Sequence, residues 1–189
     1  MTTPGQRRAT PAEHWASVQR RLGTAVTVER CIEVLSGAVT IEHPSDPAFT
    51  VLGGGNHLQR ILDGVSPDYW IRVWAARGLL YVWDDTATAA VITGLSDDAW
   101  RVREMCAKVA RLRLLGQAGD DLARLVADDV PRVRSAAVRA LADVGEAEHA
   151  AALRQALDDQ DRSVADAADR ARITMAQRLD RDLSGTGDD

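Results

Sequence analysis

The sequence is poor in cysteine and has no long hydrophobic run. Its two cysteines, Cys31 and Cys106, lie far apart and fit no CxxC or Cys/His zinc spacing, which predicts reduced thiols and argues against a disulfide framework. No apolar run approaches the roughly 18 residues of a membrane span, and the charged N-terminus MTTPGQRRATP has no apolar core behind it. We therefore expect neither membrane insertion nor secretion, and a cytoplasmic protein.

Motifs for catalysis, metals and cofactors are also missing. There is no HExxH, no GxSxG and no close Cys/His cluster, and no pair can be singled out as general acid and base among 28 acidic residues. The four histidines are dispersed at His14, His43, His57 and His149. The sequence thus predicts no catalytic residue, no metal and no cofactor.

Three consecutive glycines, Gly53 to Gly55, resemble the start of a phosphate-binding loop, but the Lys and Ser/Thr of a Walker A motif do not follow them. Leu58 stands where a dinucleotide fingerprint needs a small residue. We interpret the glycines as a bend before a helix capped by Asn56. An anion site at that helix N-terminus, aided by Arg60, is the alternative.

The charge balance is acidic, with 23 Lys and Arg against 28 Asp and Glu and a net charge of -5. This argues against general attraction to nucleic acid or anionic membranes, although a local basic face remains open. The small polar segments 1–9 and 184–189 are predicted to be disordered. Residues 10–55 are predicted to form two helices and a Gly/Pro loop that cap a repeat domain over residues 56–183.

That domain is predicted from a repeat of 31 residues, because four segments align without gaps when the chain is shifted along itself. They begin at Ser66, Asp97, Asp128 and Asp159. One position holds Ile71, Val102, Val133 and Val164; four residues later come Ala75, Cys106, Ala137 and Ala168, and seven later Gly78, Val109, Ala140 and Ala171. These spacings lie on one helical face, and a shorter amphipathic helix precedes each copy. Each repeat is therefore predicted to be a helical hairpin.

In two copies an Asp stands five residues before the repeat Val and six before an Arg, as Asp97 with Arg103 and Asp128 with Arg134. At these residues the chain resembles the HEAT-repeat family, over residues of about 56 to 180. The resemblance implies an all-α, right-handed α-solenoid of antiparallel hairpins, with an N-terminal helical cap. It also implies a structural ladder between adjacent repeats, made by Asp97, Arg103, Asp128 and Arg134. Ser66 and Ala165 depart from the pattern in the outer copies.

Six residues after the repeat Val, every copy is basic: Arg77, Lys108, Arg139 and Arg170. This position lies off the buried stripe, so these residues are predicted to form a row across the concave side. The alternative is a solvated flank balanced by acids such as Glu104 and Asp166.

Aromatic residues are few, yet six lie between residues 69 and 100: Tyr69, Trp70, Trp74, Tyr81, Trp83 and Trp100. We expect Trp74 to fill the core, and Trp70, Trp83 and Trp100 to be exposed interface anchors.

These features favour a non-enzymatic scaffold or adaptor that holds an acidic protein or peptide against the basic row and the Trp cluster. The alternative is action on DNA, because some alkylpurine DNA glycosylases resemble this architecture. Trp83, Asp84 and the basic row would then be the working residues, although the net charge argues against nucleic acid. A bilin-lyase type of function would rest on the fold alone.

Overall fold

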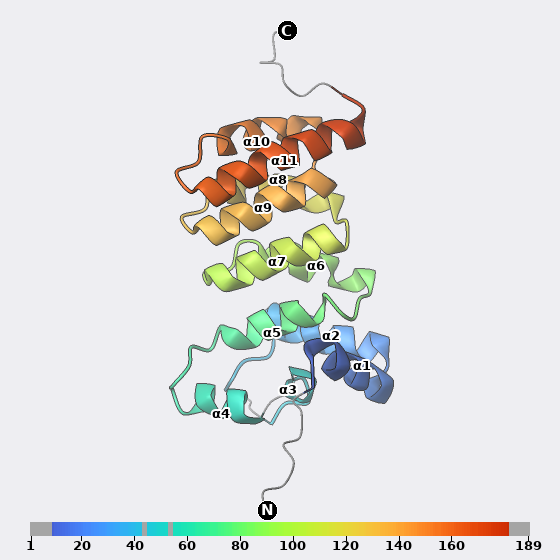
Figure 1. Cartoon of the computed structure of the whole chain (residues 1–189). Helices are drawn as coiled ribbons and strands as arrows, with labels where there is room; N and C mark the ends of the chain where they lie inside the picture. Colours follow the sequence, from blue (N-terminus) through green and yellow to red (C-terminus); the bar gives the residue numbers. More distant parts are fainter. Residues whose placement is uncertain (1–8, 43–44, 53–54, 182–189) are drawn as a thin grey trace, which may run out of the picture. The chain divides into compact units, whose positions relative to one another are not determined.

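The computed structural model describes residues 9–42, 45–52 and 55–181, and within these ranges it contains helices and no strand (Figure 1). The all-helical prediction is confirmed. None of the helices in these ranges is long and apolar enough to cross a bilayer. The predicted disordered ends, except for Ala9, lie outside the described residues. Contacts divide the chain into two compact units, one ending at Ala87 and one beginning at Thr88, and each is described by itself.

The first unit opens with α1 (Pro11–Leu22) and α2 (Thr24–Leu35). The Thr10 amide donates to Glu13 Oε2 at 2.8 Å, and the Glu13 amide donates to Thr10 Oγ1 at 3.3 Å, so α1 begins with a capping box. The helix α2 begins at Thr24, three residues before Thr27. Thr27 is buried one turn inside the helix, where its hydroxyl donates to the carbonyl of Gly23 at 2.7 Å instead of capping it.

The rest of this unit comprises α3 (Phe49–Leu52), α4 (Gly55–Leu62), α5 (Trp70–Gly78) and the short 3₁₀ turn η1 (Asp85–Ala87). The Gly/Pro segment thus includes a short helix that its composition did not reveal. The helix α4 begins at Gly55, one residue before the predicted cap Asn56, and Gly53 and Gly54 lie outside the described residues.

The core of the first unit joins the N-terminal helices to the helix of the first predicted repeat. The helix α2 packs on α5, and the buried Trp15 of α1 lies against Gly78 of α5. Ile71 and Ala75 of α5 are buried as the repeat register predicts. Burial raises the pKa of the Cys31 thiol to about 12, so this cysteine stays protonated and is a poor nucleophile.

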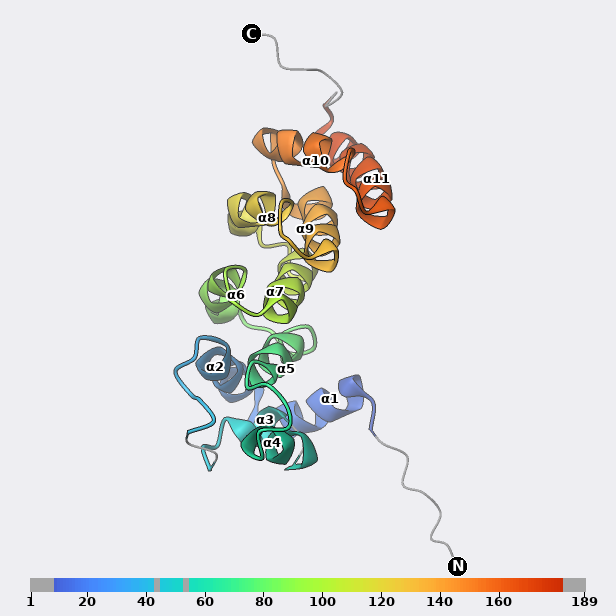
Figure 2. The same ribbon diagram turned by 90° about the vertical axis from the view of Figure 1, so that its left-hand side faces the viewer.

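The second unit consists of three pairs of helices, each a short helix followed by a long one. The pairs are α6 (Thr88–Gly94) with α7 (Trp100–Leu112), α8 (Gly119–Leu125) with α9 (Pro131–Val144), and α10 (Ala150–Ala156) with α11 (Arg162–Leu179). The 3₁₀ turns η2 (Gly116–Ala118) and η3 (Ala147–His149) precede α8 and α10. Within the unit, α9 packs against both α7 and α11. Figure 2 shows the short helices on one side of this unit and the long helices on the other.

The repeat positions explain why the long helices pack so closely. Val102, Val133 and Val164 are 0 % exposed. The residues four and seven positions later are also buried: Cys106, Ala137, Ala168, Val109, Ala140 and Ala171. Small side chains on this stripe let neighbouring helices approach. Burial raises the pKa of the Cys106 thiol well above its ordinary value, so this residue acts as a small core side chain.

Candidate functional site

The Arg side chain that follows the repeat Val bridges successive helix pairs in the second unit. Arg103 Nε lies 2.7 Å from Asp128 Oδ2, and its Nη2 lies 3.1 Å from Asp128 Oδ1. Its Nη1 also donates to the carbonyls of Asp97 at 2.8 Å and Asp98 at 3.0 Å. One guanidinium therefore ties the turn before α7 to the turn before α9 by a two-pronged ion pair.

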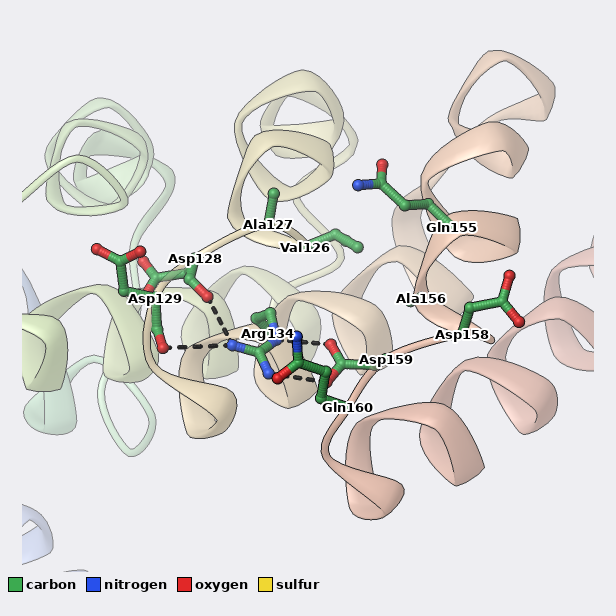
Figure 3. A pocket seen from close by; sticks show the side chains of 10 residues that line it. All are labelled: Val126, Ala127, Asp128, Asp129, Arg134, Gln155, Ala156, Asp158, Asp159 and Gln160. Carbon is green, nitrogen blue, oxygen red and sulfur yellow. Dashed lines mark hydrogen bonds and ion pairs between the residues drawn. The ribbon is translucent and has the colours of Figure 1, made fainter.

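Arg134 makes the same set of contacts one repeat later (Figure 3). Its Nε and Nη2 lie 2.6 and 2.7 Å from the two carboxylate oxygens of Asp159. Its Nη1 donates to the carbonyls of Asp128 and Asp129. Hydrogen bonds from Arg134 lower the pKa of Asp159, and Asp159 raises the pKa of Arg134.

Asp159 was not in the predicted ladder, because its own copy carries Ala165 where the ladder Arg would stand. The structure shows that each Arg bonds to the Asp of the next copy, so the last copy needs only the Asp. Each Asp also holds its own turn: Asp97 accepts from the Ala99 amide at 2.8 Å, and Asp128 from the Val130 amide at 2.9 Å.

A pocket of about 580 Å³ lies beside Arg134, between the turns that precede α9 and α11 (Figure 3). Its charged lining is mostly acidic, but Asp128 and Asp159 are bonded within the ladder. The exposed carboxylates of Asp129 and Asp158 complete the acidic side. We interpret this pocket as part of the structural ladder.

A second tie between pairs involves His149, which the sequence did not single out. Its Nδ1 accepts from the Glu146 amide at 2.8 Å, and its Nε2 lies 3.2 Å from Asp120 Oδ1. A Cβ on Gly119 would lie 2.5 Å from the imidazole Cε1. The buried imidazole thus packs directly on the start of α8, where only glycine leaves room for it.

Three members of the predicted basic row are exposed at equivalent positions of the long helices: Lys108 on α7, Arg139 on α9 and Arg170 on α11. Lys108 Nζ lies 2.8 Å from Glu104 Oε1, and Arg132 Nη2 lies 3.1 Å from the same oxygen. The buried Glu104 carboxylate therefore links α7 to α9 and compensates part of the charge at Lys108. We name the exposed side of α7, α9 and α11 around these three residues the basic face.

The two arginines of the basic face make no ion pair with the acids of their own helices, because Asp143, Asp166 and Asp169 lie within 4.0 Å of other arginines instead. Asp143, one turn after Arg139, accepts from Arg111 Nε at 2.5 Å. Asp166, one turn before Arg170, lies 3.9 Å from Arg162 Nε. Neither Arg139 nor Arg170 has an ion pair among the residues that the structure describes.

A pocket of about 440 Å³ is lined by both of these arginines, and we name it the α9–α11 pocket. Its apolar lining is formed by the buried side chains of Ala142, Ala167 and Ala171. Its polar lining is formed by Arg111, Arg139, Asp143, Arg170 and Thr174. A small, donor-rich pocket with an apolar base suits the acidic end of a ligand.

The tryptophans predicted as exposed anchors are half-buried instead. The Trp100 ring lies beside two guanidinium groups, with Arg101 Cζ at 4.2 Å and Arg132 Cζ at 5.6 Å from its centroid. In the first unit, Trp70 stacks on Trp74 with ring centroids 6.4 Å apart. Trp100 thus borders the basic face through Arg132.

The remaining predicted site residues lie in the first unit. Arg77 is exposed on α5. Trp83 Nε1 donates to Asp85 Oδ1 at 2.9 Å, and Asp84 accepts from the amide and hydroxyl of Thr86. The hydrogen bonds from Thr86 lower the pKa of Asp84. Both side chains therefore have structural partners at the start of η1.

Within the described ranges, no cluster of three or more His, Cys, Asp or Glu side chains is placed to hold a metal ion. Comparison of the sequence with models of protein families and with curated proteins finds no match.

Proposed function

We propose that the chain is a non-enzymatic binding scaffold that holds an acidic segment of another protein against the basic face of its second unit. The observation that carries this proposal is the pair Arg139 and Arg170. Both are exposed, both line an apolar-based pocket, and the acids of their own helices lie within 4.0 Å of other arginines. Arginine and small apolar pockets are typical of the centres of protein interfaces.

We further propose that the helix pairs are HEAT-like repeats of a short right-handed α-solenoid. Two features of the second unit support this. Val102, Val133 and Val164 are buried at equivalent positions of successive long helices. The pairs Arg103–Asp128 and Arg134–Asp159 repeat the same bridge one step apart. A solenoid of this kind presents one continuous face of parallel helices to a partner.

The distribution of charge explains how an acidic chain could present a basic binding face. In the second unit, aspartates gather in the turns before the long helices, where several cap amides or bind the ladder arginines. Each long helix also exposes basic side chains, Lys108 on α7, Arg132 and Arg139 on α9 and Arg170 on α11, and α11 exposes Asp166 and Asp169 beside them. An acidic segment that approaches this face can therefore contact Lys108, Arg132, Arg139 and Arg170. The attraction between these side chains and the segment should weaken as added salt shortens the Debye length, which is about 8 Å at physiological ionic strength.

The test uses a fluorescein-labelled peptide of alternating Glu and Ala and the purified full chain, with binding measured by fluorescence anisotropy at low salt. The same peptide with Gln in place of Glu is the ligand control. We expect the double variant Arg139→Glu/Arg170→Glu to weaken binding at least tenfold. The matched control is Arg124→Glu, because the Arg124 side chain is 67 % exposed on the short helix α8 and lies outside the pocket lining.

The control should change affinity less than twofold. Equal affinity of the wild type and the double variant would refute the proposal, and so would equally tight binding of the Gln peptide. Circular dichroism of each variant verifies that the helices remain folded. The alternative of action on DNA gains no support from the geometry, since Trp83 and Asp84 are engaged with Asp85 and Thr86.

A further inference from the structure

We propose that the α9–α11 pocket receives a phosphoryl group carried by a side chain of the partner protein. This inference rests on the proposed function, because it names the chemistry that the basic face prefers. The inference has two grounds. Hydrogen-bond donors outnumber acceptors in the pocket lining, and the two lining residues that belong to the basic row, Arg139 and Arg170, are both arginines.

Donors greatly outnumber acceptors in the pocket lining. Arg139 and Arg170 each carry five N–H donors, and Thr174 adds a hydroxyl. The carboxylate in the lining belongs to Asp143, and its Oδ2 already accepts from Arg111 Nε. A ligand that matches this lining must bring several acceptor oxygens and more than one negative charge.

A phosphoryl group meets that requirement better than a carboxylate. A carboxylate offers two oxygens and one charge, which a single guanidinium can satisfy through its two-pronged contact. A phosphorylated side chain offers three oxygens and about two charges near pH 7, so it can bind two guanidinium groups at once. The arginines on α9 and α11 line one and the same pocket, so both guanidinium groups are available to a ligand that enters it.

The residue types agree with this assignment. Both charged residues of the row that line the pocket are arginines, whereas the third member, Lys108, lies outside the lining and is bonded to Glu104. Arginine is suited to planar, two-pronged contacts with phosphate, while lysine acts as a point charge. The alanines at the base leave about 440 Å³ of space, enough for the phosphoryl group and the stem of the side chain that carries it.

The experiment compares three fluorescein-labelled peptides that differ only at one central position of the alternating Glu and Ala peptide: phosphoserine, Glu or Ser. Affinities for the full chain are measured by fluorescence anisotropy at physiological salt. We expect the phosphoserine peptide to bind at least tenfold more tightly than the Glu peptide. Inorganic phosphate should compete with the phosphoserine peptide more strongly than sodium chloride does at equal ionic strength.

Conservative variants separate shape from charge. Arg139→Lys and Arg170→Lys keep the positive charge and lose the planar fork, so each should weaken the phosphoserine peptide about five- to tenfold. The Glu peptide should change less than twofold with either variant. Arg162→Lys is the matched control on α11 and should leave both peptides unchanged. Circular dichroism again reports folding, and all three positions are exposed.

Several results would overturn the inference, and they can be told apart. Equal affinity for the phosphoserine and Glu peptides would overturn the phosphoryl pocket and leave the acidic-segment scaffold standing. Absence of binding by every peptide would overturn both proposals. Unchanged phosphoserine affinity in both lysine variants would show that the group binds elsewhere. Tighter binding of a single-stranded oligonucleotide, lost in the same variants, would assign the face to nucleic acid instead.

Discussion

A methyl group at position 78 tests how the first helix is held within the first unit. Gly78 is the last residue of α5, and a Cβ built on it would lie 2.4 Å from Cη2 and 2.5 Å from Cζ2 of Trp15. Carbon atoms in van der Waals contact lie about 3.5 to 4.0 Å apart. Trp15 is only 4 % exposed, so its indole cannot move aside without displacing other core side chains. The variant Gly78→Ala should therefore loosen α1.

The expected change in the free energy of unfolding combines two opposing effects. Replacing a helical glycine by alanine stabilises a helix by up to about 1 kcal/mol. Overpacking a tight core costs about 1–3 kcal/mol. If the indole left its site completely, the loss of about 200 Å² of buried apolar surface would cost about 5 kcal/mol, which is the upper limit. We expect a net destabilisation of about 1–2 kcal/mol, opposite in sign to an ordinary Gly→Ala change.

Urea unfolding followed by circular dichroism and tryptophan fluorescence measures this change. The matched control is Gly116→Ala, because no atom lies within 4 Å of a Cβ there and its φ is not positive. In the background of Trp15→Leu, the variant Gly78→Ala should destabilise the protein less than it does in the wild type. The difference, which is the coupling energy between the two positions, should be about 1 kcal/mol or more. The control Gly116→Ala should be at least as stable as the wild type. If Gly78→Ala is also at least as stable as the wild type, the proposed clash with Trp15 is refuted.

Three further predictions concern the second unit. The variant Arg134→Ala leaves the Asp159 carboxylate, which is 8 % exposed, without its arginine partner. The free energy of unfolding measured with urea should therefore fall by about 3 kcal/mol. A decrease below about 1 kcal/mol would contradict the stabilising role of the bridge. Because Arg134 lowers the pKa of folded Asp159, the stabilisation is complete above the ordinary carboxyl pKa near 4 and is lost as pH falls through the lower folded value. Urea midpoints of the wild type and Asp159→Asn should therefore differ most near pH 6 and converge toward pH 2, whereas a difference independent of pH would show that the carboxylate charge is not involved. Leu114 is 68 % exposed and has a φ of 54°, which is a strained conformation for a residue with a Cβ. The variant Leu114→Gly should therefore stabilise the protein by about 0.5–1 kcal/mol. A melting temperature lower than that of the wild type would contradict the strain at Leu114.

The repeat register allowed much of the second unit to be predicted. Burial in a helix depends on the angle of each residue around the axis, so residues at 0, 4 and 7 share a face whatever their partner is. Val133 and Ala137 are fully buried for this reason, and Arg139 is exposed two positions later for the same reason.

Other features depended on which side chains meet across the chain. The sequence indicated Arg134 as a ladder residue but not its partner Asp159, because the copy that holds Asp159 has Ala165 in place of the ladder Arg and so did not match the pattern. The sequence did not single out His149 either, which reaches Asp120 across 29 residues. The predicted exposure of Trp100 was wrong, since the two neighbouring guanidinium groups of Arg101 and Arg132 half-cover its ring.

The sequence by itself therefore determined the helical class, the 31-residue step, the buried stripe and the exposed basic positions, because each follows from local periodicity along one helix. Only the tertiary structure decided that Asp143 is bound by Arg111, so that Arg139 has no ion pair with Asp143. Only the tertiary structure also decided that Arg139 lines a pocket. That outcome depends on the side chains of neighbouring helices, where several arginines compete for few carboxylates. Which arginine binds which carboxylate depends on the distances between side chains of different helices, and sequence separation does not give those distances.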